Sequence, residues 1–359
     1  MKLTRRRFIS LLGTASLATL AGGYKIFGAG QPEVEKMTIA YPPTMAALPL
    51  VKGTQEANFM SNDGGHFHKN GVKLSLRATK GSSEAVRLVS GGQADCCITD
   101  LSSSIYGITG TGNISVTSTI FDPNNTDQYY GLLSSKFYEV TSLEDLVANW
   151  LDGTERKSIV LATRRDVQYA TDKLLTDNGF EVDEKSFYLD REDLISRMTG
   201  LLNGNYISAV LPEPLLRLAL ENPEFEGYRA NLIDNYNGVT LPPFVMVFND
   251  DLIENRPETA GNFYRGWRES VKSTNESNKL QLLGLSLQII STTLPQVGRI
   301  IEQMDLGQSF ADLFNVPTFE LPGSPNKKTY ESVVSWAVSH KFLPRSIAYD
   351  DVVDSSLDI

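Results

Sequence analysis

The sequence predicts an α/β fold of two Rossmann-like lobes, with a hinge and an interlobe cleft between them and a helical C-terminal extension. Short apolar segments alternate with amphipathic segments of helical spacing, which favours parallel sheets covered by helices. This alternation starts again after a short link near residue 125. The 359 residues also exceed what one hydrophobic core normally organises, which favours two lobes.

The first run of the pattern predicts four strands and two helices. The segment 72–78 alternates polar and apolar residues, as a half-buried strand does. Helical spacing of apolar residues predicts a helix at 83–90, and a second helix is expected at 102–108. The other expected strands are 37–41, 95–98 and 114–120.

The second run begins with an expected strand at 129–134. Ser142 and Asp145 frame a capping-box-like start for a helix through Asn149. Gly179 is a typical stop for a helix that begins at Asp166. The remaining expected elements are strands at 158–162, 187–189 and 207–211 and a helix at 192–202. Two of these strands, 158–162 and 207–211, are continuously apolar, as buried parallel strands are.

The last part of the chain is expected to cross back and then become helical. The segment 241–248 is interpreted as an extended return crossing, and Pro257 favours the first turn of a helix. Helices are expected at 261–273, 279–291, 294–304 and 327–340. The first lobe would therefore comprise 37–124 and 245–359, and the second 125–244. The crossings near 121–127 and 241–248 would bend as hinges.

The N-terminus predicts an export signal within residues 1–30. Arg5, Arg6 and Arg7 precede an apolar run from Leu11 to Ala21, in the manner of a twin-arginine export signal. The run is shorter than the roughly 20 apolar residues that span a bilayer. Cleavage after Ala21, cleavage nearer residue 30 and retention as an anchor all stay open. The signal predicts a periplasmic or otherwise extracytoplasmic location.

The charge and the cysteines exclude several classes of protein. Residues 1–30 hold five basic and no acidic residues, so the remainder has a formal charge of −15, against −10 for the whole chain. This charge argues against nucleic acid and anionic membrane surfaces as partners. Cys96 and Cys97 are adjacent and lie in an expected buried strand, where free cysteine packs as a small hydrophobe. Redox or metal chemistry is the less favoured alternative for them.

Common catalytic motifs are missing from the sequence. It holds no GxSxG elbow, HExxH motif, P-loop or Rossmann glycine fingerprint, and His66, His68 and His340 are its three histidines. His66 and His68 with Asp63 form a weak set of metal ligands, and we expect neither a metal nor a cofactor. These observations favour a binding protein over an enzyme.

Four segments carry a resemblance to a known family: 67–74 (FHKNGVKL), 91–95 (GGQAD), 201–214 (LLNGNYISAVLPEP) and 249–258 (NDDLIENRPE). In their order and spacing they resemble the substrate-binding proteins of ABC importers with the type 2 periplasmic-binding fold. The resemblance points to the nitrate, sulfonate, taurine and thiamine-pyrimidine branch and covers nearly the whole mature chain.

This resemblance implies an extracytoplasmic component of an ABC importer. It would capture a small polar or anionic organic solute, of the sulfonate, nitrate or thiamine-pyrimidine type, by closing two lobes around it. Its partners would be the small-molecule ligand and the permease membrane subunits, and we expect a monomer. Two alternatives stay open: a thiamine-pyrimidine synthase-like enzyme on the same fold, and a solute receptor for a membrane sensor.

The turns after the parallel strands form the candidate ligand site, because ligands bind at the carboxyl ends of such strands. Their hydroxyls and helix-start amides suit an oxyanion or a polar head group, although Ser, Thr and Asp there can also simply cap helices. The candidate residues are Tyr41, Thr44, Met45, Lys80, Ser82, Ser83, Thr99, Asp100, Ser102, Arg164, Arg165, Asp166, Glu213 and Phe244.

The pair Arg164 and Arg165, on the one hand, and Glu213, on the other, predict opposite ligand charges. Arg164 and Arg165 stand where proteins of the resembling family usually have small residues, and a guanidinium there would grip an acidic group. The alternative is a solvated pair that points away from the cleft. Glu213, at the end of an expected strand, could accept hydrogen bonds from an amine or amidine, or be an exposed loop carboxylate. A zwitterion or a polar heterocycle would satisfy both charges.

Overall fold

The computed structural model describes residues 34–55, 65–126, 128–151, 159–161, 166–181, 188–190, 194–221, 227–293 and 308–356. The expected export signal, the expected helix at 294–304, and Asp63, Arg164 and Arg165 lie outside these residues. Within the described part of the chain, none of the helices combines the length and the apolar character needed to cross a membrane.

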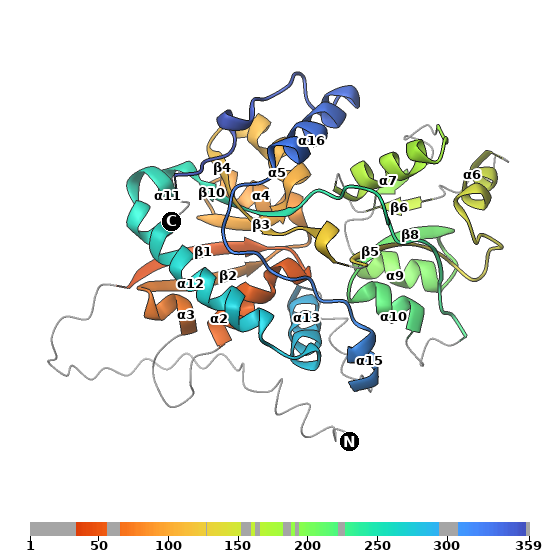
Figure 1. Cartoon of the computed structure of the whole chain (residues 1–359), viewed down its shortest axis with the longest axis horizontal. Helices are drawn as coiled ribbons and strands as arrows, with labels where there is room; N and C mark the ends of the chain where they lie inside the picture. Colours follow the sequence, from red (N-terminus) through yellow and green to blue (C-terminus); the bar gives the residue numbers. More distant parts are fainter. Residues whose placement is uncertain are drawn as a thin grey trace, which may run out of the picture.

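The first of two five-stranded sheets has the strand order β2-β1-β3-β10-β4 (Figure 1). Strands β2, β1 and β3 are parallel, whereas β10 runs antiparallel to both of its neighbours. The strands are β1 (Glu35–Tyr41), β2 (Val72–Ala78), β3 (Cys96–Asp100), β4 (Ile114–Phe121) and β10 (Phe244–Asn249). We call this sheet, with the helices that cover it, the first lobe.

The second sheet repeats the same plan in the order β7-β6-β8-β5-β9. Strands β7, β6 and β8 are parallel, and β5 is antiparallel to β8 and β9. The strands are β5 (Tyr130–Ser134), β6 (Ile159–Leu161), β7 (Tyr188–Asp190), β8 (Ser208–Pro212) and β9 (Asn231–Asp234). This sheet and its helices form the second lobe, which lies beside the first (Figure 1).

Helices cover both faces of each sheet, as α/β packing requires. On the first sheet, α2 (Leu48–Gln55), α3 (Gly65–Lys69) and α12 (Pro257–Asn275) pack on one face. The other face carries α4 (Ser82–Ser90), α5 (Leu101–Thr111) and α16 (Lys327–Ser339).

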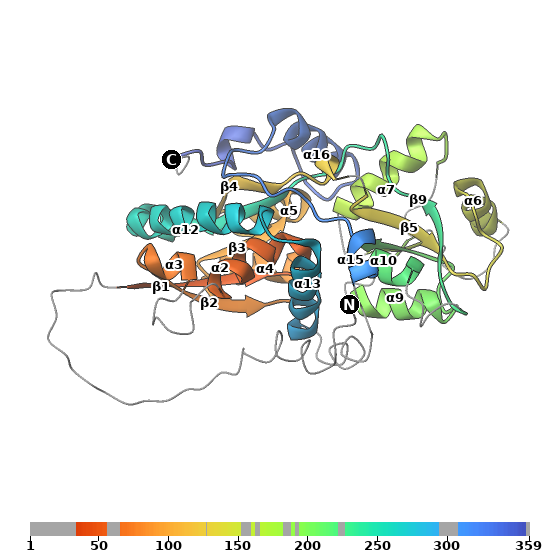
Figure 2. The ribbon, with the colours of Figure 1, turned by 60° about the horizontal axis from the view of Figure 1, so that its bottom comes forward.

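On the second sheet, α9 (Leu194–Leu202) and α10 (Leu215–Glu221) pack against β8. Figures 1 and 2 show α6 (Leu143–Leu151) and α7 (Asp166–Asp177) away from these two helices. The other elements are α11 (Asp250–Asn255), α13 (Lys279–Thr293), α15 (Gln308–Leu313), η1 (Met45–Ala47), η2 (Pro123–Asn125) and η4 (Tyr349–Asp351).

The expected strands are all present, and β2 has the predicted bounds. The interpretation of 241–248 as a crossing is wrong for most of that segment. Residues 244–248 form β10, which is hydrogen-bonded on both sides in the middle of the first sheet, so they cannot act as a hinge. Their continuous apolar run is buried on both faces, as in a central strand. Two segments therefore connect the two sheets: 122–129, the first crossing, and 235–243, the second crossing.

The adjacent cysteines are buried and free, as the packing interpretation predicts. Cys96 belongs to the core under one face of the sheet and Cys97 to the core under the other, because successive strand residues point to opposite faces. Burial raises the pKa of both thiols, which disfavours the reactive thiolate form.

Gly266 on α12 lets this helix approach α3 closely. A Cβ at this position would lie 2.9 Å from the Cα of Phe67 and 3.2 Å from the carbonyl oxygen of His66. We expect Gly266→Ala to lower the free energy of unfolding by about 1–3 kcal/mol, because the contact atoms belong to backbone. Urea unfolding measures this change. Gly284→Ala on α13, where the added Cβ meets no described atom within 4 Å, is the matched control and should not destabilise the protein. Equal losses in both variants would contradict the explanation.

Candidate functional site

The carboxyl ends of β3 and β8 meet at a buried aromatic cluster. Phe244 pairs with Asp100 at the end of β3 and with Phe121 at the end of β4. The rings of Phe244 and Phe121 stack with centroids 4.8 Å apart, and the Tyr129 ring lies 5.1 Å from Phe121 and 5.9 Å from Phe244. The Tyr129 carbonyl accepts a hydrogen bond of 2.9 Å from the amide of Glu213, directly after β8. The cluster therefore joins the strand ends of the two lobes.

The turn after β1 contributes one polar group to this region. Thr44 precedes η1, and its hydroxyl is buried without a hydrogen-bond partner among the described residues. The amide and hydroxyl of Thr79 donate to the carbonyl of Tyr41, at 2.9 and 3.1 Å, and so hold the turns after β1 and β2 together. Tyr41 and Met45, both predicted as ligand contacts, are buried in the core of the first lobe.

The turn after β3 holds a capping carboxyl and two buried hydroxyls. Asp100 caps α5 by accepting a hydrogen bond of 2.7 Å from the amide of Ser103. Burial raises the pKa of Asp100, and the hydroxyls of Ser103 and Ser82 oppose this rise. Within the described chain, the buried hydroxyls of Thr99 and Ser102 have no hydrogen-bond partner. Asp100 thus fulfils the capping role that the sequence leaves open.

Glu213 provides a buried carboxyl from the second lobe. Its side chain is 0% exposed, so the alternative of an exposed loop carboxylate is wrong. Oε1 accepts a hydrogen bond of 3.0 Å from Nε of Arg217, whereas Oε2 has no partner in hydrogen-bond geometry within the described chain. Burial raises the pKa of Glu213 to about 8, against the opposing effects of Arg217 and of the nearby Asn315 backbone. The peptide bond from Glu213 to Pro214 is cis.

The remaining predicted residues make weaker contributions. The Lys80 side chain is exposed, and its amide donates to the carboxylate of Glu84 at 2.8 Å in the first turn of α4. Ser83 is half-buried in the same turn. The structure leaves undescribed Arg164, Arg165 and the side chain of Asp166. The hypothesis that one of the two arginines faces the cleft therefore stays a prediction.

Sequence reasoning missed Arg217, Gln128 and Thr126. Nη2 of Arg217 donates to Oε1 of Gln128 at 2.6 Å, which links α10 to the first crossing. Nε2 of Gln128 and the hydroxyl of Thr126 are buried without a hydrogen-bond partner among the described residues. The four-residue spacing of Glu213 and Arg217 would have been a usable signal had a helix been expected at 215–221.

No protein-family model and no curated protein sequence matches the chain. Solved structures do match it. The nitrate-binding protein NrtA from Synechocystis PCC 6803 has a TM-score of 0.65 at 12% identity, with 91% of this chain and 88% of that protein covered. The alkanesulfonate-binding protein SsuA from Xanthomonas axonopodis pv. citri, bound to MOPS, has a TM-score of 0.63 at 11% identity, with 91% and 99% covered.

A protein from Candida albicans, described as having the generic periplasmic binding protein fold, has a TM-score of 0.60 at 12% identity and covers 89% of this chain. The alignment covers 96% of that protein. This chain has the periplasmic-binding-protein fold. At such identities the likeness concerns the fold, and the ligand has to be argued from the residues of this chain.

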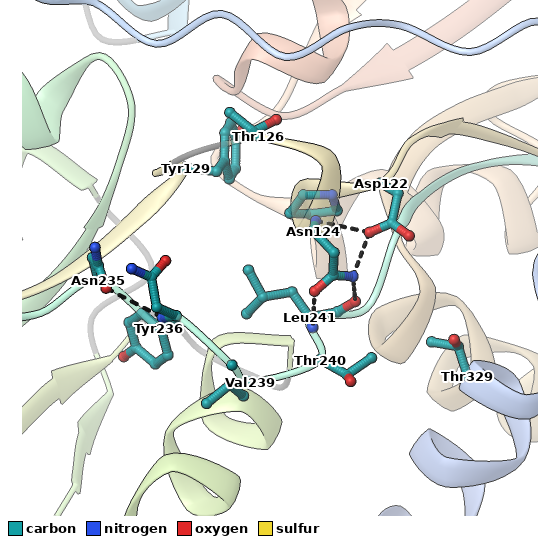
Figure 3. A pocket seen from close by; sticks show the side chains of 13 residues that line it. Asp122, Asn124, Thr126, Tyr129, Asn235, Tyr236, Val239, Thr240, Leu241 and Thr329 are labelled. Atoms are coloured by element: carbon teal, nitrogen blue, oxygen red, sulfur yellow. Dashed lines mark hydrogen bonds between the residues drawn. The ribbon is translucent and has the colours of Figure 1, made fainter.

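In this periplasmic-binding-protein fold, a pocket of about 420 Å³ lies between the two crossings (Figure 3). None of the residues predicted for the site lines it. Tyr129 lines the pocket and also belongs to the aromatic cluster, so the two features adjoin. The pocket leaves space beside the segments that would bend if the lobes moved. Buried polar atoms without a described partner occur at the strand ends as well, at Thr44, Thr99, Ser102 and Glu213.

Asn124 connects the two crossings across this pocket. Its side chain accepts a hydrogen bond of 2.7 Å from the amide of Leu241 and donates one of 2.8 Å to the carbonyl of the same residue (Figure 3). We expect Asn124→Ala to destabilise the protein by about 1–3 kcal/mol and to speed hydrogen exchange of the Leu241 amide, because both backbone groups lose their partner. Exchange mass spectrometry measures this. The exposed Asn237 offers a control, and equal exchange in Asn124→Ala and Asn237→Ala would contradict the assignment.

Proposed function

We propose that the protein is the extracytoplasmic solute-binding component of an ABC importer and captures a small polar solute between its lobes. The observation that carries this proposal is a group of buried polar atoms without described partners. They come from both lobes and from the first crossing: the hydroxyls of Thr44, Thr99 and Ser102, Nε2 of Gln128 and Oε2 of Glu213. Most buried polar groups in folded proteins are paired, so an unpaired group of this kind suits a bound ligand.

Two further observations support the proposal. Solved proteins with this fold include binding proteins for nitrate and for alkanesulfonates. The sequence of residues 1–30 has the features of an export signal, as an extracytoplasmic receptor requires. We propose the first lobe as 37–124 with 245–359 and the second as 125–244. Nitrate, a sulfonate or a thiamine-type pyrimidine is the starting set of solutes.

The proposed mechanism is closure of the lobes about the two crossings. A ligand that contacts the turns after β1 and β3 on one lobe and Glu213 on the other gains more contacts when the lobes are closed. It then shifts the population toward the closed form by this difference in affinity. The backbone of the first crossing, 122–129, and of the second crossing, 235–243, would change conformation as the lobes close. The permease subunits would recognise the closed form.

Thermal shift, small-angle scattering and mass spectrometry test the proposal together. We expect one class of solute to raise the melting temperature, because a ligand of the native state alone stabilises it. The same solute should reduce the radius of gyration and be recovered unchanged. Chemical conversion of the solute, or binding without any compaction, would reject the proposal.

Removing the hydroxyl of Ser102 should affect ligand affinity and protein stability differently. We expect Ser102→Ala to weaken ligand binding about tenfold, the equivalent of one hydrogen bond, with little loss of stability because this hydroxyl has no described partner. Ser104 on the same helix is the matched control, since its hydroxyl donates to the carbonyl of Leu101 at 2.7 Å. Ser104→Ala should lower stability and leave affinity unchanged. Calorimetric titration and urea unfolding measure the two quantities, and a reversed pattern would contradict the assignment.

A further inference from the structure

The second lobe presents a buried hydrogen-bond acceptor where the strand ends meet. Glu213 is 1% exposed, and its Oε1 is held by Arg217. Its Oε2 has no partner in hydrogen-bond geometry among the described residues, although the Asn315 backbone lies near enough to the carboxyl to lower its pKa. A buried acceptor without a donor costs about 1–3 kcal/mol, and more when it is charged. A ligand that donates a hydrogen bond to Oε2 would remove this cost for the ionised carboxyl, whereas a ligand that carries only acceptors could pair only with the O–H of the protonated form.

The first lobe adds a second acidic group to the same region. Asp100 is 2% exposed and lies beside Phe244, whose ring is part of the cluster that leads to Glu213. Burial raises the pKa of Asp100 and of Glu213, so both carboxyls resist ionisation, Glu213 despite its contact with Arg217. The hydroxyls of Thr99 and Ser102, which have no hydrogen-bond partner among the described residues, can accept as well as donate.

Described cations at these strand ends are poorly placed to bind an anion. The Lys80 side chain is exposed, and Arg217 already donates to Glu213 and Gln128. An oxyanion placed beside Oε2 of Glu213 could accept a hydrogen bond only while this carboxyl is protonated, and it would meet like charge once the carboxyl ionises. A nitrogen base placed there would gain hydrogen bonds and a charge of opposite sign.

We propose that the buried part of the ligand is a nitrogen base that donates N–H groups to Glu213, such as an amidine, a guanidine or an aminated ring, and is not an oxyanion. This inference rests on the proposed function and narrows its class of solute. Planar groups are the first probes, because the backbone amide of Glu213 is hydrogen-bonded to Tyr129, whose ring packs with that of Phe244 in the aromatic cluster. Sulfonate and nitrate would then be excluded as the natural ligands.

Isosteric pairs of probes test this preference by calorimetric titration of the full chain. Each pair has one shape and opposite chemistry: benzamidine and benzoate, acetamidine and acetate, and guanidinium and nitrate at millimolar concentration. We expect benzamidine to bind at least about tenfold more tightly than benzoate, with the same order in the smaller pairs. Equal or tighter binding of the anions, or no binding of any nitrogen base, would overturn the inference.

The outcomes also separate this inference from the proposed function. Tight binding of nitrate or benzoate with compaction in scattering would overturn the inference and leave the solute-binding function intact. Conversion of a bound probe to a product, or its binding without compaction, would instead reject the function. Both readouts come from the same samples.

Substitutions of Glu213 and Asp100 test whether these carboxyls cause the preference for nitrogen bases. We expect Glu213→Gln, which preserves the shape of the side chain, to lose at least tenfold in benzamidine affinity, while the exposed control Glu139→Gln leaves it unchanged. Asp100→Asn, which keeps a helix-capping side chain, should cause a smaller loss and serves if the first variant does not fold. Unchanged benzamidine affinity in a folded Glu213→Gln protein would overturn the assignment. If that variant does not fold, unchanged affinity in Asp100→Asn would do so.

Discussion

Replacing Arg217 with methionine should lower the free energy of unfolding by about 3–5 kcal/mol at alkaline pH and by clearly less at acidic pH. Nε of Arg217 lies 3.0 Å from Oε1 of Glu213, and the two side chains are 15% and 0% exposed. Removing the guanidinium leaves a buried carboxyl without its cation, and it also removes the hydrogen bond to Gln128. The methionine retains most of the apolar stem of the arginine, so lost packing contributes little.

The pH dependence follows from the direction of the pKa shift. Burial raises the pKa of Glu213 from its ordinary value of 4.5 to about 8, so the folded protein binds a proton that the unfolded chain has lost in this range. The wild-type protein should therefore lose stability, by the order of a few kcal/mol, as the pH rises from 4.5 to about 8. Arg217 opposes the shift, so its removal raises the pKa further and extends the loss to higher pH.

Urea unfolding at about pH 5, 7 and 9 measures this linkage. Glu213→Gln is the control, because an amide does not titrate and the slope assigned to this residue should disappear. The double variant Arg217→Met/Glu213→Gln should be less destabilised at alkaline pH than the two single changes summed, since the residues are in contact. An equal cost of Arg217→Met at acidic and alkaline pH would contradict the proposed coupling.

The alternation of strands and helices could be predicted from the sequence because it depends on the spacing of apolar and polar residues within short segments. Strand β2 alternates polar and apolar residues, and β8 is a continuous apolar run before Pro212. Local patterns did not predict the position of strand β10 in the sheet. Its apolar run is interpreted from the sequence as an extended crossing, because its place between β3 and β4 depends on pairing with residues more than 120 positions earlier in the chain. No local pattern records such a pairing.

The same limit applies to the candidate site. Asp100 and Glu213 could be found from sequence because the ends of expected parallel strands are where ligands bind. Arg217 and Gln128 could not, because their hydrogen bond joins residues 89 positions apart. Whether Glu213 is exposed or buried also depends on tertiary structure. Its burial, which the sequence does not show, is the main cause of its raised pKa. Sequence reasoning therefore located the strand ends but not the partners that set their electrostatics.

Replacing Phe121 with alanine should lower the free energy of unfolding by about 3–5 kcal/mol. Phe121 is fully buried at the end of β4, where the first crossing begins. Its ring contacts those of Phe244 at 4.8 Å, Tyr129 at 5.1 Å and Phe319 at 5.7 Å. The change would leave a cavity among Phe244, Tyr129 and Phe319, which lie in three different segments and cannot all move inward to fill it. Urea unfolding measures the loss, and Phe137→Ala, at a ring that is 52% exposed, should cost less than about 1 kcal/mol.

The position of Phe121 gives this prediction a second readout. Phe244 begins β10, Tyr129 ends the first crossing, and the chain containing Phe319 pairs with β4 through the amide of Glu320 and the carbonyl of Ile120. A cavity among them should loosen the anchors of both crossings, so hydrogen exchange should rise at 122–129 and 235–243 more than in α12. If protection falls equally throughout the first lobe, Phe121 acts as a general core residue. A rise confined to the crossings would identify it as the residue that fixes the hinge to the first sheet.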